Sequence, residues 1–154
     1  SIEPSSENLS LLRKNIAGHT NIHVEHAALA TEGGAREVEL KDRGTGSWGL
    51  TVVDNPADRP APSIETVKTI TIEEICKKYG FDHPAIVKMD IEGAELNVLQ
   101  DSNWLQQVPI LLIELHERIA PGCEAAFFRA SRNRFVFRAS GEKFLSVRCG
   151  SHET

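Results

Sequence analysis

The chain has 154 residues, of which 40% are hydrophobic and 25% are charged, and its formal net charge is −5. These values are typical of a globular protein with one substantial core, so we expect a single domain over residues 1–154. The negative charge gives no reason to expect nucleic acid or an acidic membrane as a partner. No apolar run approaches the roughly 20 residues that span a bilayer.

The cysteines Cys76, Cys123 and Cys149 are odd in number, far apart, and without the spacing of metal ligands. Free thiols of this kind indicate a reducing compartment. We therefore predict a cytoplasmic protein and assign the cysteines no chemistry.

The chain opens with residues 1–4, which are typical of the end of a strand because Pro4 cannot donate a ladder hydrogen bond. Ser5 or Ser6 can cap the helix that follows. Glu3 thus lies where a strand ends and a helix begins, and a carboxylate there can accept hydrogen bonds from vicinal hydroxyls such as those of a ribose. The alternative is that Glu3 is a solvated surface acid, and because only one acid is present, this alternative is favoured.

Residues 22–29 alternate weakly and predict a second strand that leads into a loop. His19, His23 and His26 occur close together here. A zinc site needs converging ligands, but His23 and His26 would point to opposite faces of a strand. We interpret all three as ordinary strand and loop histidines.

Residues 31–70 differ in pattern from the rest of the chain. Strand-like segments at 36–40, 48–53 and 67–70 are separated by glycine-rich turns and by a proline-rich loop over 54–63. This region is predicted to be a β-rich insertion between two elements of an α/β core.

Residues 85–100 are the most informative stretch of the chain. Residues 85–89 predict a strand buried on both faces of a parallel sheet, and Leu96 and Leu99 have helical spacing. Asp90 and Glu92 occupy the turn between them, where open α/β sheets bind ligands. Acids in a first helical turn also favour the positive end of the helix dipole, so ligand contact and capping are weighted equally.

Two further helices are predicted, over residues 71–80 and over residues 124–133. Thr71 and Glu74 form a capping box at the first. In the second, Phe127 and Phe128 are expected to point inward. Residues 135–138 and 143–147 flank a short turn and predict a hairpin.

A second buried strand is predicted over residues 108–116, and it too ends in charged side chains. Two adjacent parallel strands would bring Asp90, Glu92, Glu114 and His116 to one edge of the sheet. Such a group can bind a divalent metal or hold an acid–base pair, or its acids can simply satisfy backbone amides. We assign no metal ligand on this generic spacing. His116 is the proton acceptor expected at neutral pH.

Several segments, in matching order and spacing, resemble the FkbM-type methyltransferases, and together they cover nearly the whole chain. They are Ile2-Glu3-Pro4 with the helix ending at Lys14-Asn15, residues 67–75, residues 87–99, and Ile113-Glu114-Leu115-His116. The third resembles the family's Lys-x-Asp-x-Glu-Gly-x-Glu signature, and the fourth its Glu-x-His.

The resemblance implies an α/β fold with the Rossmann-like sheet of class I S-adenosylmethionine-dependent methyltransferases, whose last strand is antiparallel. Residues that match the family's first strand and glycine-rich loop would precede Glu3. We therefore expect a methyltransferase domain that lacks its first strand and is truncated at its N-terminus. The unpaired strand edges could then pair in a homo-oligomer.

The resemblance also implies the cofactor S-adenosylmethionine and residues that bind it. Glu3, followed by Pro4, would hold the ribose hydroxyls, and the loop at His26 and Ala27 would lie by the adenine. Asp90 would face the methionine end of the cofactor or the substrate.

The implied reaction is O-methylation of a hydroxyl on a sugar or a secondary-metabolite-like small molecule. Methyl transfer from a sulfonium is an in-line displacement, so positioning supplies much of the catalysis. Glu92 would orient the substrate, and Asp90, Glu92 or His116 would take the hydroxyl proton. The alternatives are a non-catalytic scaffold with the same fold and, less favoured, a metal-assisted hydrolase that uses these residues with Glu114.

Overall fold

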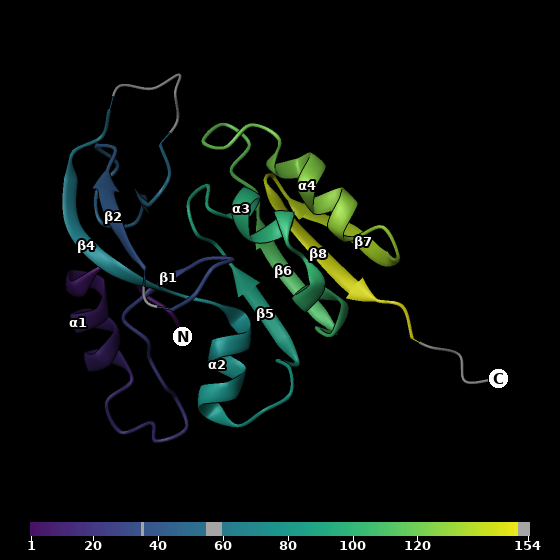
Figure 1. The fold of residues 1–154 in the computed structure, drawn as a ribbon, viewed down its shortest axis with the longest axis horizontal. Helices are drawn as coiled ribbons and strands as arrows, with labels where there is room; N and C mark the ends of the chain where they lie inside the picture. The colour runs from purple at the N-terminus through teal and green to yellow at the C-terminus, as the bar shows by residue number, and fades with distance from the viewer. Residues whose placement is uncertain (35, 55–59, 151–154) are drawn as a thin grey trace. The chain divides into compact units, whose positions relative to one another are not determined.

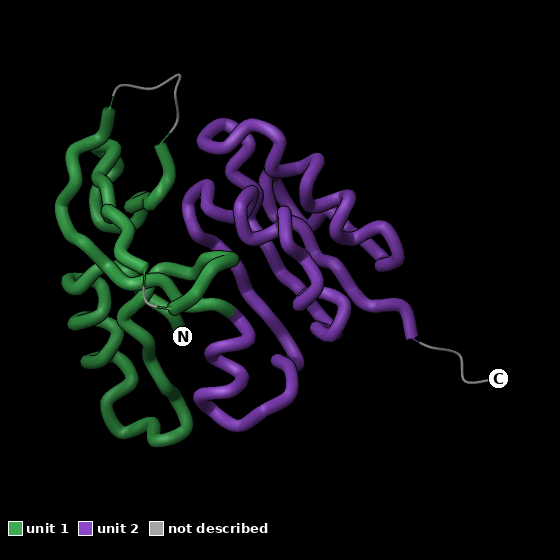
Figure 2. The backbone as a smooth tube through the Cα atoms, viewed as in Figure 1, with its two compact units in different colours: residues 1–71 green, residues 72–154 purple. Residues whose placement is uncertain are grey.

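The computed structural model describes residues 1–34, 36–54 and 60–150. This part of the chain contains both helices and strands (Figure 1), and the strands form two four-stranded sheets, so the protein is an α/β protein. The chain divides into two compact units, unit 1 over residues 1–71 and unit 2 over residues 72–154 (Figure 2). The expectation that residues 1–154 form one domain stays a prediction.

Unit 1 begins with the predicted helix. Ser5 caps it, because its side chain accepts a hydrogen bond from the Asn8 amide, and Leu9 is buried on its inner face. Just before the helix, Ile2 forms an isolated parallel bridge with Glu25, as the strand-like start of the chain predicts. The helix is α1 (Ser6–Asn15).

The sheet of unit 1 has the order β1-β4-β2-β3. β1 pairs with β4 in parallel, whereas β2 is antiparallel to both β4 and β3. The region predicted to be β-rich therefore does form a sheet. The strands are β1 (Ala28–Leu29), β2 (Glu37–Asp42), β3 (Leu50–Thr51) and β4 (Ser63–Ile70).

The strand boundaries in unit 1 differ from the prediction for all four strands, and β2 begins and ends later than the predicted 36–40. Of residues 22–29 only the last two form β1. Ile22 is exposed, so the start of this segment does not bury an apolar side chain as a core strand would. β3 is shorter than 48–53, and β4 begins earlier than 67, directly after Pro62. Residues 55–59 of the predicted proline-rich loop lie outside the described residues.

The sheet of unit 2 has the order β5-β6-β8-β7. β5 and β6 are parallel, and β8, the last strand, is antiparallel to both β6 and β7. The predicted hairpin is thus the pair β7–β8. The strands are β5 (Ile86–Met89), β6 (Ile110–Glu114), β7 (Arg134–Ser140) and β8 (Lys143–Arg148).

The helices of unit 2 bury apolar side chains that complete its core. Val98, Leu105 and Phe127 are each at most 2% exposed, as are Leu111 and Ile113 of the central strand β6. The rings of Phe127 and Phe144 lie 5.3 Å apart between their centroids. The helices are α2 (Ile72–Tyr79), α3 (Glu95–Gln100), α4 (Cys123–Ala130) and the short 3-10 helix η1 (Asn103–Gln106).

Two expectations about burial in unit 2 are wrong. β5 is not buried on both faces, because it is an edge strand of its sheet and Ile86 is 62% exposed. Phe128 does not point inward as Phe127 does; it is 48% exposed. Consecutive helical residues lie about 100° apart around the axis, and Phe128 lies on the more exposed side of α4. Whether the β5 edge pairs in a homo-oligomer stays a prediction.

Candidate active site

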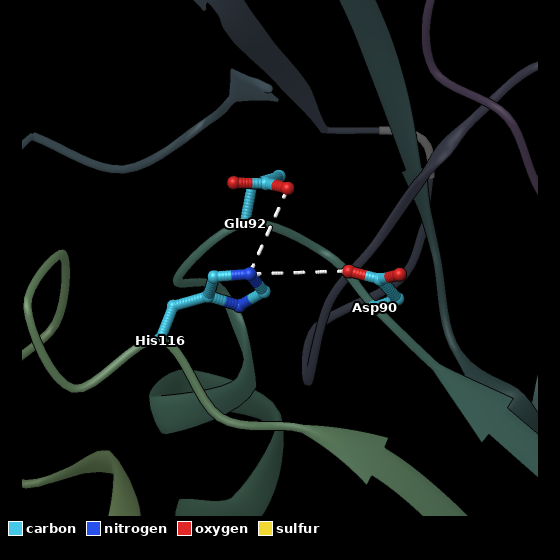
Figure 3. A group of neighbouring side chains, drawn as sticks. All are labelled: Asp90, Glu92 and His116. Carbon is cyan, nitrogen blue, oxygen red and sulfur yellow. Dashed lines mark ion pairs between the residues drawn. The ribbon is translucent and has the colours of Figure 1, made fainter. Parts of the chain in front are cut away.

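The carboxyl ends of β5 and β6 bring three predicted site residues together in unit 2. Met89 pairs in register with Ile113, so the two parallel strands end at the same edge of the sheet. Asp90 directly follows β5, and His116 follows β6 by two residues. Asp90, Glu92 and His116 each offer one ligand or acid–base atom within 4.8 Å of the others (Figure 3). We call these three residues the edge cluster.

One nitrogen of His116 lies between the two acids of the edge cluster. Its Nε2 atom is 3.6 Å from Oε1 of Glu92 and 3.9 Å from Oδ1 of Asp90, as the dashed lines in Figure 3 show. Both distances are longer than hydrogen bonds, so the contacts are ion pairs when His116 is protonated. The Asp90 side chain is 34% exposed, whereas that of His116 is only 9% exposed. The edge cluster is therefore accessible from the side of Asp90.

A tight turn directs Glu92 toward His116. Glu92 has φ +50°, the left-handed region that costs a residue other than glycine about 1–2 kcal/mol. Gly93 follows with φ +99°, and a Cβ atom there would lie 2.5 Å from Cγ2 of Ile119. Only glycine fits this position without displacement of Ile119. Gly93 is thus a geometric requirement of the turn, whereas Glu92 adopts its conformation at a cost.

Glu95 is a site residue to which the sequence alone assigned no role. Its side chain is fully buried and accepts hydrogen bonds from the amides of Ile91 and Gly93, each at 2.8 Å. Its Oε1 atom also lies 3.0 Å from Nδ1 of His116. Because a carboxylate only accepts, Nδ1 carries the hydrogen, and Nε2 faces the edge cluster. Glu95 therefore orients both the turn and the imidazole.

The pKa values of two residues in the edge cluster are raised, and the causes differ. Burial lowers the pKa of His116, but the hydrogen bond to Glu95 and the charges of Glu95, Glu92 and Asp90 outweigh it, and the pKa is raised. The pKa of Glu92 is also raised, chiefly by burial, with the nearby acids adding to the effect and His116 opposing it. The neighbouring acids thus favour the protonated form of His116.

Glu114 was expected at the same edge but is engaged elsewhere. Its carboxylate lies 3.3 Å from Nζ of Lys143, which is its cross-strand partner on β8. Lys88 lies 3.1 Å from Oδ2 of Asp90, so Asp90 has a basic neighbour on the side away from the imidazole. The predicted group of four therefore reduces to a cluster of three.

The other predicted site residues lie together in unit 1. The Glu3 amide donates to the carbonyl of Glu25, and Oε1 of Glu3 accepts a hydrogen bond from the Ser5 amide. Nε2 of His26 is 3.0 Å from the Pro4 carbonyl oxygen, and Ala27 is buried.

The three histidines of unit 1 do not form a metal site. Among the described residues the edge cluster is the group whose ligand atoms converge, and His19, His23 and His26 are not part of such a group. Nε2 of His26 instead lies 3.1 Å from Oε1 of Glu65. The interpretation of these histidines as ordinary strand and loop residues agrees with this geometry.

Comparison with known proteins adds what the geometry leaves open. Residues 1–138 match the family profile described as the Methyltransferase FkbM domain, and the match includes the whole edge cluster and Glu3. The chain belongs to the FkbM methyltransferase family. The resemblance that the motifs indicated is thereby confirmed, and the family supports methyltransferase activity.

A curated relative is similar over a shorter region. The chain is 39% identical over 57 residues to the hexuronic acid methyltransferase AglP of Haloferax volcanii. The match covers 36% of this chain and 24% of that protein. No solved structure matches the chain. Within the described residues, no helix is both long enough and apolar enough to cross a membrane.

Proposed function

We propose that this protein is an S-adenosylmethionine-dependent O-methyltransferase whose acceptor is a hydroxyl group of a sugar or a similar small molecule. Family membership supports methyl transfer. The observation that carries the choice of acceptor is the edge cluster, in which a buried imidazole and two carboxylates converge beyond two parallel strands. Such groups bind hydroxyls and accept their protons.

The topology of unit 2 supports a class I Rossmann-like sheet. Its central strand β6 has the parallel strand β5 on one side and the antiparallel strand β8 on the other. β7 completes the order beyond β8. This is the arrangement that the resemblance implies for the end of the sheet, with an antiparallel last strand.

Residues of unit 1 fit the ribose and adenine of the cofactor. Glu3 is a partly exposed carboxylate between a parallel bridge and a helix, and its hydrogen bond from Ser5 fixes one oxygen. A carboxylate retains further acceptor positions, which suit a pair of vicinal hydroxyls. Pro4, His26 and Ala27 are the neighbouring residues that we assign to the adenine side. When bound, S-adenosylmethionine would supply an electrophilic methyl group on its sulfonium.

In unit 2, the edge cluster would hold the acceptor hydroxyl and remove its proton. Asp90 and Glu92 can each accept a hydrogen bond from a hydroxyl, and Nε2 of His116 faces the same space. Glu95 keeps the imidazole fixed, so little reorganisation is needed. We assign Asp90, Glu92 and His116 as the catalytic residues.

The nature of the acceptor is supported by the relative's name, in which the substrate is a hexuronic acid. We infer a sugar-like small molecule with adjacent oxygen atoms. The scaffold alternative is less favoured, because a fold kept without chemistry gains nothing from the strained Glu92 or from the converging acids.

Calorimetric titration of S-adenosylmethionine and of its demethylated product tests this function. We expect both to bind, and Glu3→Gln to weaken binding at least tenfold, because the neutral amide accepts less strongly from two hydroxyls. Glu7→Gln, which changes a nearby acid on α1, is the matched control and should bind normally. Binding of neither compound by the folded protein would refute the proposal.

A further inference from the structure

We propose that the edge cluster of Asp90, Glu92 and His116 binds a divalent cation, which in turn holds oxygen atoms of the methyl acceptor. The second half of this statement rests on the proposed function, whereas the first concerns the chain alone. The spacing of these residues in the sequence predicts no metal ligand, because it does not show how closely their ligand atoms converge.

The separations within the edge cluster suit ligands of one ion. Nε2 of His116 is 3.6 Å and 3.9 Å from the two carboxylate oxygens, and all three atoms lie within 4.8 Å of one another. An octahedral ion with ligands at roughly 2.1 Å holds adjacent ligand atoms about 3 Å apart and opposite ones about 4.2 Å apart. A small rotation of the carboxylates would bring all three within this range.

The imidazole is already oriented as metal-binding histidines are. Such histidines donate their second ring N–H to a carboxylate, which fixes the tautomer and makes the first nitrogen a better ligand. Here the second nitrogen of His116 lies 3.0 Å from the fully buried Glu95. The His116 side chain is itself nine-tenths buried, and Figure 3 shows its Nε2 atom directed between the two acids.

Glu95 also holds the turn that carries the other two ligands. It accepts the amide hydrogens of Ile91 and Gly93, which flank Glu92 in the chain. One buried carboxylate thus fixes the histidine ligand and the backbone that supplies the carboxylate ligands. This is a second arrangement, independent of the cluster's own distances, that suits a preorganised metal site.

Three atoms of the edge cluster that face one another would gain from a cation placed between them. Two carboxylate oxygens face a ring nitrogen whose lone pair points at them when His116 is neutral. Lys88 contacts Asp90 through Oδ2, so Oδ1 is the atom on the side of the imidazole. A divalent ion between these atoms would replace repulsion with three favourable contacts.

Two carboxylate oxygens and one imidazole nitrogen form a mixed donor set that suits Mn²⁺ or Mg²⁺. Three protein ligands leave positions for water or for the acceptor. Because Asp90 is the more exposed ligand, these positions lie on the open side. A coordinated hydroxyl releases its proton more readily. In this complex Nε2 is a ligand, so the proton passes to a carboxylate oxygen or to water.

Titration of the protein with Mn²⁺ alone, followed by loss of the free-ion EPR signal, tests the cation site. We expect one bound ion per chain, and His116→Gln or Asp90→Asn should each lower the affinity at least tenfold. Glu95→Gln should lower it about 10–100-fold through the orientation of His116. Glu114→Gln is the matched control, because this acid lies at the same edge but pairs with Lys143.

The outcomes separate this inference from the proposed function. Absence of Mn²⁺ binding, or equal binding by the folded Asp90→Asn variant, would overturn the cation site. Asp90 is exposed, so this variant should fold even if Glu95→Gln does not. Mn²⁺ binding without methyl transfer to any sugar acceptor would leave the cation site intact and refute the proposed function. Methyl transfer that persists in chelator would leave the proposed function intact and overturn the role of the ion in holding the acceptor.

Discussion

Unit 2 buries a charged side chain at each end of its sheet, and the two differ in how their hydrogen bonds are used. Near the start of β6, the guanidinium of Arg134 donates to the carbonyls of Leu105, Val108 and Pro109. It also donates to the carbonyl and the hydroxyl oxygen of Ser146. At the other end, Glu95 joins two backbone amides to His116.

The difference between these networks lies in where each ends. The Arg134 network closes on backbone carbonyls and a buried serine pair, so it offers nothing to a ligand. The Glu95 network ends on an imidazole whose second nitrogen faces two acids and a partly open surface. A buried charge alone therefore does not mark an active site. The candidate site lies where the network ends on an atom that faces a partly open surface, which here is Nε2 of His116.

Substitution of Arg134, whose network ends on backbone carbonyls, should produce the largest loss of stability. Arg134→Met removes charged donors from several buried carbonyls, so we expect the free energy of unfolding to fall by about 3 kcal/mol or more. Urea denaturation measures this change. Mn²⁺ affinity of the protein that remains folded should be unchanged, and a fall below about 1 kcal/mol would show that the network contributes little.

Substitution of Glu95, whose network ends on His116, should reduce stability less but should change the pKa of His116. Glu95→Gln keeps the size of the side chain but removes a charge that accepts two amides and the His116 N–H, so we expect a loss of about 1.5–3 kcal/mol. The pKa of His116 should fall, because its hydrogen bond to Glu95 is the main cause that raises it. NMR titration of the imidazole protons reports the pKa directly. A Glu95→Gln variant with an unshifted His116 would contradict the assigned contact.

The pH dependence of stability should reveal the ionisation of His116 at its end of the unit 2 sheet. The pKa of His116 is raised in the folded state, so its protonation stabilises the fold fully below the unfolded pKa of histidine. This contribution is lost as the pH rises through the folded pKa. Compared with His116→Gln, the wild type should therefore be relatively more stable in mild acid than in mild base. Parallel pH profiles of urea midpoints for the two proteins would exclude the effect.

The smallest expected effect is a gain in stability. Glu92→Gly removes a residue other than glycine from the left-handed region, and relief of that strain should raise stability by up to about 1 kcal/mol. The same change removes a carboxylate that we propose as both a catalytic group and a metal ligand, so activity and Mn²⁺ binding should both decline. Thermal unfolding measures the first effect. A clear loss of stability would mean that contacts of the Glu92 side chain outweigh the strain.

Local patterns in the sequence were sufficient to predict the elements that carry the site. The apolar runs at β5 and β6 followed by charge placed Asp90 and His116 at one edge, and parallel pairing in register confirms that arrangement. Ser5, next to Pro4, marked the start of α1. These features depend on neighbours in the chain, which a sequence displays directly.

What the sequence did not reveal depends on residues that are distant in the chain. An acid in the first turn of a helix is usually solvated, whereas Glu95 is fully buried and contacts His116, which is 21 residues away in the chain. Likewise, the exposure of Ile86 follows from the position of β5 at the sheet edge, and that of Phe128 from the rotation of α4. Motif spacing carries none of this information.

The two amides held by Glu95 have a consequence for solvent exchange. Turn amides usually exchange with deuterium quickly, but those of Ile91 and Gly93 are bonded to a carboxylate that water does not reach. Their exchange rates are therefore set by opening of the turn itself. In a sample without cofactor, substrate or ion, the exchange rates of these two amide protons therefore report how often the loop that carries Glu92 opens.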